Sequence, residues 1–329
     1  MLRLSIVIPA LGDHAALESG LVSVLEHRPP ASEVLVVFNS EYADPYHLRD
    51  EIRFIEAPAG AGPLECLAAG SRAARGEIVH VLAAGLEVRP GWAEHALAPL
   101  ADPAVACVSP LLIDQASPDE TVVAGGWGYR RGGRAYPLAA GLPADEVAGL
   151  PLVGPTRLAG FYQRQALAPL AALAGLGIGD ELAFVALGLH LQAAGYRASL
   201  APESRIGVPS ACLEAAESGF RQGLHQECLF WRSAGLTGWA GSLVAHAALV
   251  AAELPSAVVR PRNWAKLAGR AVGLTAMLGL RRRSDLLFEP AEQPLPIDAE
   301  IPERRTDLRH GAIMGRGQEQ NAGRSLRSA

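Results

Sequence analysis

The first hundred residues alternate between almost unbroken apolar stretches and stretches whose apolar residues recur at helical spacing. Buried strands are predicted at residues 4–8, 33–38, 52–55, 77–82 and 104–109. Helices are predicted between them, at residues 17–28, 63–75 and 90–100. Strands without a polar face must be covered on both sides, and helical connections make neighbouring strands parallel. The chain is therefore predicted to form an α/β fold around a mostly parallel sheet flanked by helices.

The second half of the chain is less regular. Glycine and proline are frequent in residues 111–152, which predicts long loops or a small excursion from the sheet. A helix over 179–194 and a strand over 196–200 are predicted next. Residues 236–252 then form an apolar run without Asp, Glu, Lys or Arg, slightly shorter than the ~20 residues of a membrane span. A buried or docked helix is the expectation for this run, and an interfacial helix is the alternative.

These patterns divide the chain into three parts. Residues 1–235 are predicted as the α/β domain, 236–280 as apolar and basic C-terminal helices, and 281–329 as a disordered tail. Basic side chains follow the apolar run, at Arg260, Arg262, Lys266 and Arg270. Such a segment suits the inner face of a membrane, but the same charges could equally form a solvated surface.

Composition narrows the choice of partners and compartment. The formal net charge is −5, and no basic surface with interleaved aromatic residues is apparent, so a nucleic-acid partner is not expected. Cys66, Cys107, Cys212 and Cys228 form no CxxC pair, which predicts reduced thiols in a cytoplasmic protein. The apolar N-terminus is interpreted as a first strand and not as a signal peptide.

Several stretches of the chain, taken in order, resemble the glycosyltransferases of family 2, which have a GT-A fold. The resemblance extends over residues 2–232. It is carried by LSIVIP at 4–9, SEVLVVFNS at 32–40, AGPLECLAAGSRAARGEIVHVL at 61–82, EVRPGW at 87–92, LAGFYQRQAL at 158–167 and LHLQAAGYRASLAPES at 189–204. No single stretch is specific, but their ordered agreement implies a GT-A fold and a nucleotide-sugar partner.

The resemblance also implies three acidic positions, and this sequence lacks all of them. A carboxylate that holds the base or ribose is expected after the second strand, where Phe38 stands. A D-x-D pair that binds a divalent cation is expected after the fourth strand, where the sequence reads Ala83-Ala84-Gly85. A general base is expected on a later helix, at Ala183-Phe184. Because methyl groups cannot ligate Mg²⁺ or Mn²⁺, no divalent metal cofactor is expected.

The expected nucleotide-sugar pocket is lined by Pro9, Phe38, Asn39, Ser40, Ala83, Ala84, Gly85 and Glu87. Asp180 and Glu181 lie three residues before the expected base and are the weak catalytic candidates, although acids at a helix N-terminus also favour the helix dipole. Glu87 could likewise be an ordinary surface glutamate. Arg130, Arg131 and Arg134 could contact phosphates or the acceptor in place of a cation, or be solvated loop charges.

Two functional hypotheses follow. In the first, the protein is a family-2-like binding or regulatory module for a nucleotide sugar or glycan that has lost metal-dependent catalysis. In the second, it is an active, divergent and metal-independent glycosyltransferase that moves a sugar from a nucleotide sugar to an acceptor hydroxyl. Retention of the scaffold cannot decide between them, because fold does not determine function.

Overall fold

The computed structural model describes residues 3–280 except 13, 41, 43, 45, 148, 213–218 and 260. The tail predicted at 281–329 lies outside these residues. The strands are β1 (Leu4–Ala10), β2 (Ser32–Phe38), β3 (Ile52–Glu56), β4 (Ile78–Leu82), β5 (Glu87–Val88), β6 (Val105–Asp114), β7 (Val122–Ala124), β8 (Trp127–Arg130), β9 (Arg134–Pro137), β10 (Ala159–Gln163) and β11 (Arg197–Val208). The α-helices are α1 (His14–His27), α2 (Pro63–Ala73), α3 (Trp92–Leu97), α4 (Leu170–Ala174), α5 (Asp180–Ala193), α6 (Gly219–Ser233), α7 (Trp239–Val259) and α8 (Pro261–Leu280).

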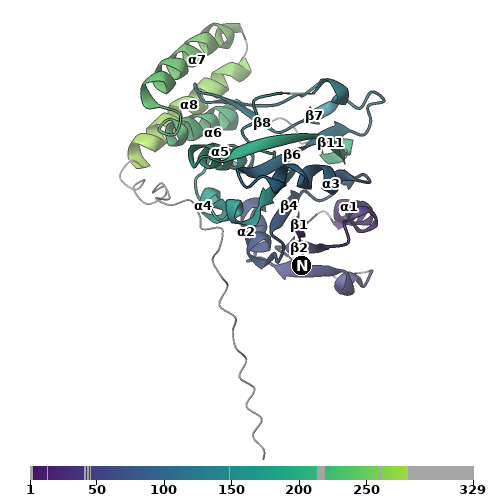
Figure 1. The fold of residues 1–329 in the computed structure, drawn as a ribbon. Coiled ribbons are helices and arrows are strands. Elements are labelled where there is room, and N and C mark those ends of the chain that lie inside the picture. The colour runs from purple at the N-terminus through teal and green to yellow at the C-terminus, as the bar shows by residue number, and fades with distance from the viewer. Residues whose placement is uncertain are drawn as a thin grey trace, which may run out of the picture. The chain divides into compact units, whose positions relative to one another are not determined.

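The main sheet is parallel where the alternating pattern predicted it and mixed beyond that point. Its strand order is β3-β2-β1-β4-β10-β6-β11-β5, with β7 paired to β6 (Figure 1). The pairs among β3, β2, β1 and β4 are all parallel, as is the pair β6–β11. Strand β10 enters antiparallel between β4 and β6, because no crossover helix separates it from the glycine-rich region before it.

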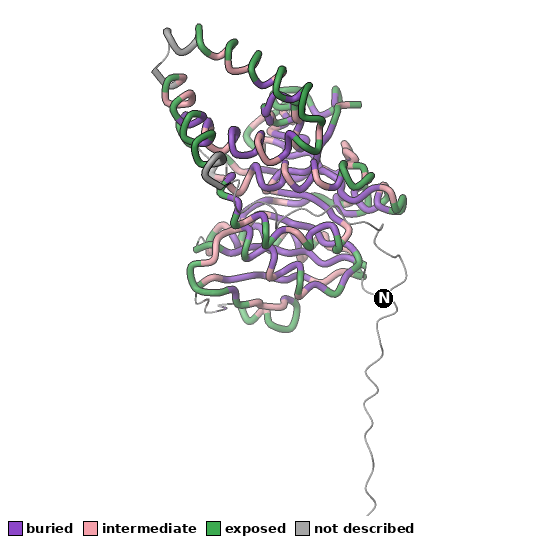
Figure 2. The backbone as a smooth tube through the Cα atoms, turned by 90° about the vertical axis from the view of Figure 1, so that its left-hand side faces the viewer, coloured by how far each residue is buried: buried purple, intermediate pink, exposed green. Residues whose placement is uncertain are grey.

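Side chains on the two faces of the sheet fill two separate cores. On β1, Val7 faces the core under α2, α4 and α5, whereas Leu4, Ile6 and Ile8 face the core under α1 and α3. The period of two along the strand explains this division, since successive side chains point to opposite faces. Strands β1, β4 and β6 are accordingly almost fully buried, and buried residues are concentrated in the sheet, as Figure 2 shows. The α/β layering predicted from the sequence is therefore confirmed.

The glycine-rich region forms the predicted excursion. It holds the end of β6, strand β7 and a separate β8–β9 hairpin in which Trp127 pairs with Pro137 and Arg130 with Arg134. The backbone carbonyl of Gly132, at the tip of the hairpin, accepts a hydrogen bond from His246 of α7. The hairpin therefore links the sheet domain to the C-terminal helices.

The C-terminal helices pack against α6. Helices α6 and α8 approach closely at glycines, because a Cβ atom built on Gly223 would lie 1.9 Å from the carbonyl oxygen of Lys266. None of the described helices combines the length and apolar content that crossing a bilayer requires. Helix α7 does dock on the protein, but most of its side chains face solvent. Of the buried or docked arrangement expected for this segment, the structure thus shows the docked one.

Candidate functional site

A pocket of about 270 Å³ lies at the carboxyl edge of the parallel strands, where ligands bind in open α/β sheets. It is lined by Pro9, Leu11, Ala16, Pro63, Leu67, Ala83, Ala84, Arg157, Leu158 and Cys212. Pro9 is near the end of β1, and Ala83 directly follows β4, so the parallel pairing of these strands brings them to one edge. Three of the residues predicted to line the nucleotide-sugar pocket, Pro9, Ala83 and Ala84, therefore lie together in this pocket.

Gly85 completes the turn after β4 and leaves no room for a side chain. Its φ is +85°, in the left-handed region that L-residues with a Cβ rarely adopt. A Cβ atom there would lie 3.0 Å from Sγ of Cys212 and 3.1 Å from Cβ of Ala16. A carboxylate at position 85 would therefore require a different backbone conformation. The two preceding positions, Ala83 and Ala84, carry only methyl groups.

The described residues that line the pocket include no carboxylate that could bind a divalent cation. Among the described residues, no group of three or more His, Cys, Asp or Glu side chains is close enough to hold a metal ion. His80, on β4, has its ring stacked on Phe161 at a centroid distance of 3.9 Å, and its Nδ1 lies 3.1 Å from the carbonyl oxygen of Gly160. Burial lowers the pKa of His80 to about 3, so it is a neutral core residue. The described residues around the turn thus do not fit a Mg²⁺ or Mn²⁺ site.

Arg157 is the one charged side chain among the described residues that line the pocket. It precedes β10, and its side chain is 16% exposed. Its Nε donates to Oε2 of Glu181 at 3.2 Å. A guanidinium carries five N–H donors in a planar fork that matches phosphate oxygens. Sequence reasoning missed Arg157, although it immediately precedes the segment LAGFYQRQAL that carried part of the resemblance.

Glu181 is held beside Arg157 from the first turn of α5. Its Oε1 accepts hydrogen bonds from Trp127 Nε1 at 2.7 Å and from the backbone N–H of Arg157 at 3.3 Å. Ala183 and Phe184, where a base was expected, are buried in the core. Because α5 begins at Asp180, Glu181 lies about one turn before them. Glu181, one of the two weak catalytic candidates, is therefore connected to the pocket through Arg157.

The aromatic end of β2 does not fill the pocket. Phe38 stacks on Tyr42, with ring centroids 4.6 Å apart and an interplanar angle of 12°, and also contacts Phe54. Asn39 donates from Nδ2 to the carbonyl oxygen of Ala61 at 2.9 Å, while Ser40 is exposed. The pocket lining thus does not include these three predicted residues, although they lie at the carboxyl end of a strand adjacent to β1.

Glu87 and the three hairpin arginines are engaged elsewhere. Glu87, on β5, accepts a hydrogen bond from Gln115 Nε2 at 2.6 Å. The guanidinium carbon of Arg130 lies over the Tyr136 ring, 5.6 Å from the ring centroid. Nη1 of Arg131 would lie 3.8 Å from a Cβ atom built on Gly241 of α7. Arg134 lines a second pocket, of about 340 Å³, together with residues of α6, α7 and α8. The structure does not bring Arg130, Arg131 or Arg134 to the pocket beside Ala83.

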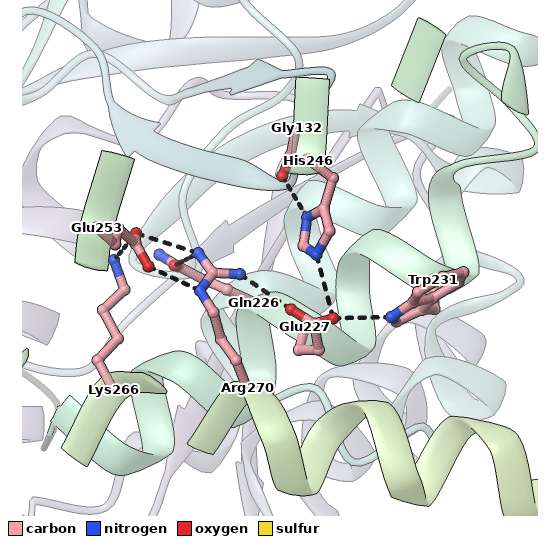
Figure 3. Close-up of polar contacts among 8 residues, drawn as sticks. All are labelled: Gly132, Gln226, Glu227, Trp231, His246, Glu253, Lys266 and Arg270. Carbon is pink, nitrogen blue, oxygen red and sulfur yellow. Dashed lines mark hydrogen bonds and ion pairs between the residues drawn. The ribbon is translucent and has the colours of Figure 1, made fainter. Parts of the chain in front are cut away.

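A buried polar cluster lies between the second pocket and the core of the helices, and Figure 3 shows its contacts. Arg270 of α8 is 4% exposed and donates to Glu227 Oε2 at 3.1 Å, to Glu253 Oε2 at 2.9 Å and to Gln226 Oε1 at 3.2 Å. Lys266 donates to Glu253 Oε1 at 2.7 Å. The cluster joins α6, α7 and α8 by ion pairs, so we assign it a structural role.

His246 closes the cluster on the side of the hairpin. Its Nδ1 lies 2.8 Å from the carbonyl oxygen of Gly132 and its Nε2 3.2 Å from Oε1 of Glu227 (Figure 3). A carbonyl and a carboxylate only accept hydrogen bonds, so this geometry suits a ring that donates from both nitrogens. The ring also stacks on Phe230 at a centroid distance of 3.8 Å. His246 thus fixes α7 to both α6 and the hairpin.

Comparison with solved structures identifies the class of fold. The mannosyltransferase PcManGT from Pyrobaculum calidifontis, solved with GDP-Man and Mn²⁺, matches with a TM-score of 0.50 at 17% identity, over 83% of this chain and 87% of that one. GalNAc-T7, solved with UDP, GalNAc and Mn²⁺, matches with a TM-score of 0.49 at 15% identity, over 68% of this chain and 47% of that one. The fold is that of the GT-A glycosyltransferases.

A sequence comparison bears on the N-terminal part of the chain. Residues 5–136 match the profile described as Glycosyl transferase family 2. This part of the chain is therefore similar to the family-2 glycosyltransferases, in agreement with the resemblance that the ordered sequence stretches predicted. Comparison with curated protein sequences gives no significant match.

Proposed function

We propose that this protein binds a nucleotide sugar in the pocket beside Ala83 and Ala84 without a divalent cation, and serves as a binding or regulatory module. The observation that carries the proposal is the open pocket at the carboxyl edge of the sheet, in which methyl groups stand where metal ligands would be needed and Arg157 provides positive charge. A diphosphate carries negative charge that must be compensated when it is bound. Arg157 offers that compensation through a guanidinium whose orientation Glu181 fixes.

Nucleotide binding is expected to raise the melting temperature whether or not manganese is present. A ligand that binds only the folded state stabilises it by RT ln(1 + [L]/Kd), about 2.7 kcal/mol at a hundred times Kd. A thermal-shift screen with UDP-, GDP- and dTDP-sugars, each in EDTA and in MnCl₂, measures this effect. The same screen shows which nucleobase the pocket prefers. Stabilisation that appears only with manganese contradicts the proposal, and a screen in which no nucleotide shifts the transition removes its basis.

We propose an active, metal-independent glycosyltransferase as the second candidate function, because Glu181 lies beside the arginine of the pocket. Its Oε1 accepts two hydrogen bonds and its Oε2 accepts one from Arg157, which leaves Oε2 able to accept a proton from an acceptor hydroxyl. A general base of this kind contributes about 10²–10⁴-fold to a rate.

Turnover of a donor sugar tests this second candidate. Glu181→Ala is expected to abolish any transfer or donor hydrolysis, whereas Glu87→Ala, which removes a glutamate bonded to Gln115, leaves it unchanged. Release of the nucleotide from the donor, with and without glycan acceptors, is the measurement. Equal loss in both variants would mean that Glu181 is not the base, and absence of turnover in the unaltered protein would leave the binding module as the function.

We also propose that the protein works in the cytoplasm and contacts the inner face of the membrane through residues 236–280. The four cysteines, none of which forms a disulfide, support a reducing compartment. The run of basic residues after the apolar segment supports the contact with a membrane.

A further inference from the structure

Helix α7 is amphipathic, but its polar side chains face the protein and its apolar side chains face solvent. Between Trp239 and Pro255 its polar side chains are Ser242, His246 and Glu253, and all three face the protein. Ser242 is fully buried and His246 is 9% exposed. Soluble proteins normally direct the apolar stripe of a surface helix inward and the polar one outward. Polar contacts therefore help to hold α7 on the protein.

The outward side of α7 carries no charged side chain, and its one hydrogen-bonding group is the indole N–H of Trp239. Its exposed residues are Trp239, Ala240, Gly241, Leu243, Val244, Ala247, Ala248, Ala251, Ala252, Leu254 and Pro255. Val244 is 72% exposed, Leu254 51% and Leu243 41%. Exposed residues predominate along the helix, as Figure 2 shows. Contiguous exposed apolar surface of this kind marks an interaction site.

The width of this surface favours a broad apolar medium over a single partner helix. At about 100° per residue, the exposed positions cover an arc of roughly 200° around the helix. A helix that pairs with one other helix needs only a narrow stripe, such as the two positions in seven of a coiled-coil seam. An interfacial helix, in contrast, presents one whole side to the acyl chains.

The charge distribution in the sequence indicates which lipids would be preferred. Residues 254–284 hold seven basic and no acidic side chains, in a chain whose formal net charge is −5. Lys266 and Arg270 are paired with glutamates inside the protein, and the other five are Arg260, Arg262, Arg281, Arg282 and Arg283. Clusters of four to eight basic residues next to an apolar segment attract anionic headgroups.

We infer that the outward face of α7 inserts into the interfacial region of an anionic lipid bilayer. The inference rests on the proposed membrane location and specifies its surface, its depth and its lipid class. Ser242, His246 and Glu253 hold the helix on the protein, so that Leu243, Val244 and Leu254 meet the acyl chains without any internal rearrangement. Trp239, 45% exposed at the start of the helix, suits the headgroup boundary where tryptophan is enriched.

Vesicle co-sedimentation of the full chain tests the inference. We expect binding to phosphatidylcholine vesicles with 30% phosphatidylserine, about tenfold weaker binding to pure phosphatidylcholine, and weakening in high salt. Val244→Glu is expected to weaken binding to the anionic vesicles about tenfold or more, since a valine that meets the acyl chains is replaced by a charge. The matched control is Val22→Glu, because Val22 is 67% exposed on α1 and is not part of the surface.

Three outcomes would overturn the inference. The first is that the unaltered protein sediments with neither vesicle. The second is that Val22→Glu reduces binding as much as Val244→Glu. The third is that Val244→Glu converts a dimer to a monomer in analytical ultracentrifugation, which assigns the surface to a second copy of the chain. Nucleotide-induced thermal shifts measured on the same variants separate this question from the proposed function, because α7 does not line the nucleotide pocket.

Discussion

Arg157→Ala is expected to weaken nucleotide-sugar binding about 10- to 100-fold. A hydrogen bond to a charged group contributes about 1.5–3 kcal/mol, and each 1.4 kcal/mol corresponds to a factor of ten in affinity. Arg157 is the charged residue of the described pocket lining, so no neighbouring cation of that lining can replace it. Isothermal titration calorimetry with the nucleotide sugar selected by thermal shift measures the loss.

Two control variants separate the effect of positive charge from the effects of guanidinium geometry and of the position of the arginine. Arg157→Lys keeps the charge but loses the planar fork, so an intermediate affinity is expected. Arg134→Ala removes an exposed arginine that lines the other pocket and should bind like the unaltered protein. If Arg134→Ala lost affinity and Arg157→Ala did not, the phosphate site would lie in the second pocket and the proposed location would be wrong.

Arg270→Met is expected to lower the free energy of unfolding by about 3–5 kcal/mol. Removing one partner of a buried ion pair leaves the other charge without compensation, and such losses are among the largest that single substitutions cause. Arg270 and Glu227 are each only 4% exposed, and Arg270 also neutralises Glu253. Urea unfolding followed by circular dichroism gives the change.

An exposed ion pair provides the control for this prediction. Arg197 donates to Asp102 Oδ2 at 2.6 Å, but the two side chains are 66% and 46% exposed. Arg197→Met should therefore cost no more than about 1 kcal/mol. Similar losses for Arg197→Met and Arg270→Met would show that the cluster between α6, α7 and α8 does not stabilise the fold as we propose.

The same cluster predicts how stability depends on pH. Burial alone would raise the pKa of Glu227, but its hydrogen bonds and charge interactions with His246, Trp231 and Arg270 lower it below the usual value. The pKa of Glu253 is lowered in the same way by Arg270 and Lys266, against the effect of burial. The folded state therefore binds fewer protons than the unfolded chain in acid, and stability falls as the pH drops below about 4.5. Arg270→Met should show a shallower decrease over this range.

The sequence predicted the scaffold well where local pattern determines structure. Unbroken apolar strands and helical spacing placed β1 to β4 and their helices, because burial on both faces leaves few alternatives. The pattern did not predict the antiparallel entry of β10, which depends on how a long glycine-rich excursion returns to the sheet. Strand β11 also extends to Val208, past Pro202, where the sequence pattern had indicated only residues 196–200.

Prediction of the site was more limited, because pockets form from residues distant in sequence. Pro9, Ala83 and Ala84 could be placed together from their positions at strand ends. Arg157 could not, since nothing in the surrounding sequence predicts that its side chain lines the pocket beside the turn after β4. The environment of α7 was likewise hidden, because an apolar run indicates a helix but does not indicate which side faces the protein. Only the contacts of Ser242, His246 and Glu253 reveal that orientation.

The central claim is that the pocket beside Ala83–Gly85 holds a nucleotide sugar without a divalent cation. Calorimetric titration of the unaltered protein with the selected nucleotide sugar, once in EDTA and once in saturating MnCl₂, tests it most directly. We predict dissociation constants that agree within about twofold, because the described residues around the turn provide no carboxylate pair to hold the ion. Binding that is tenfold or more tighter in manganese, or that occurs only with it, would contradict the claim.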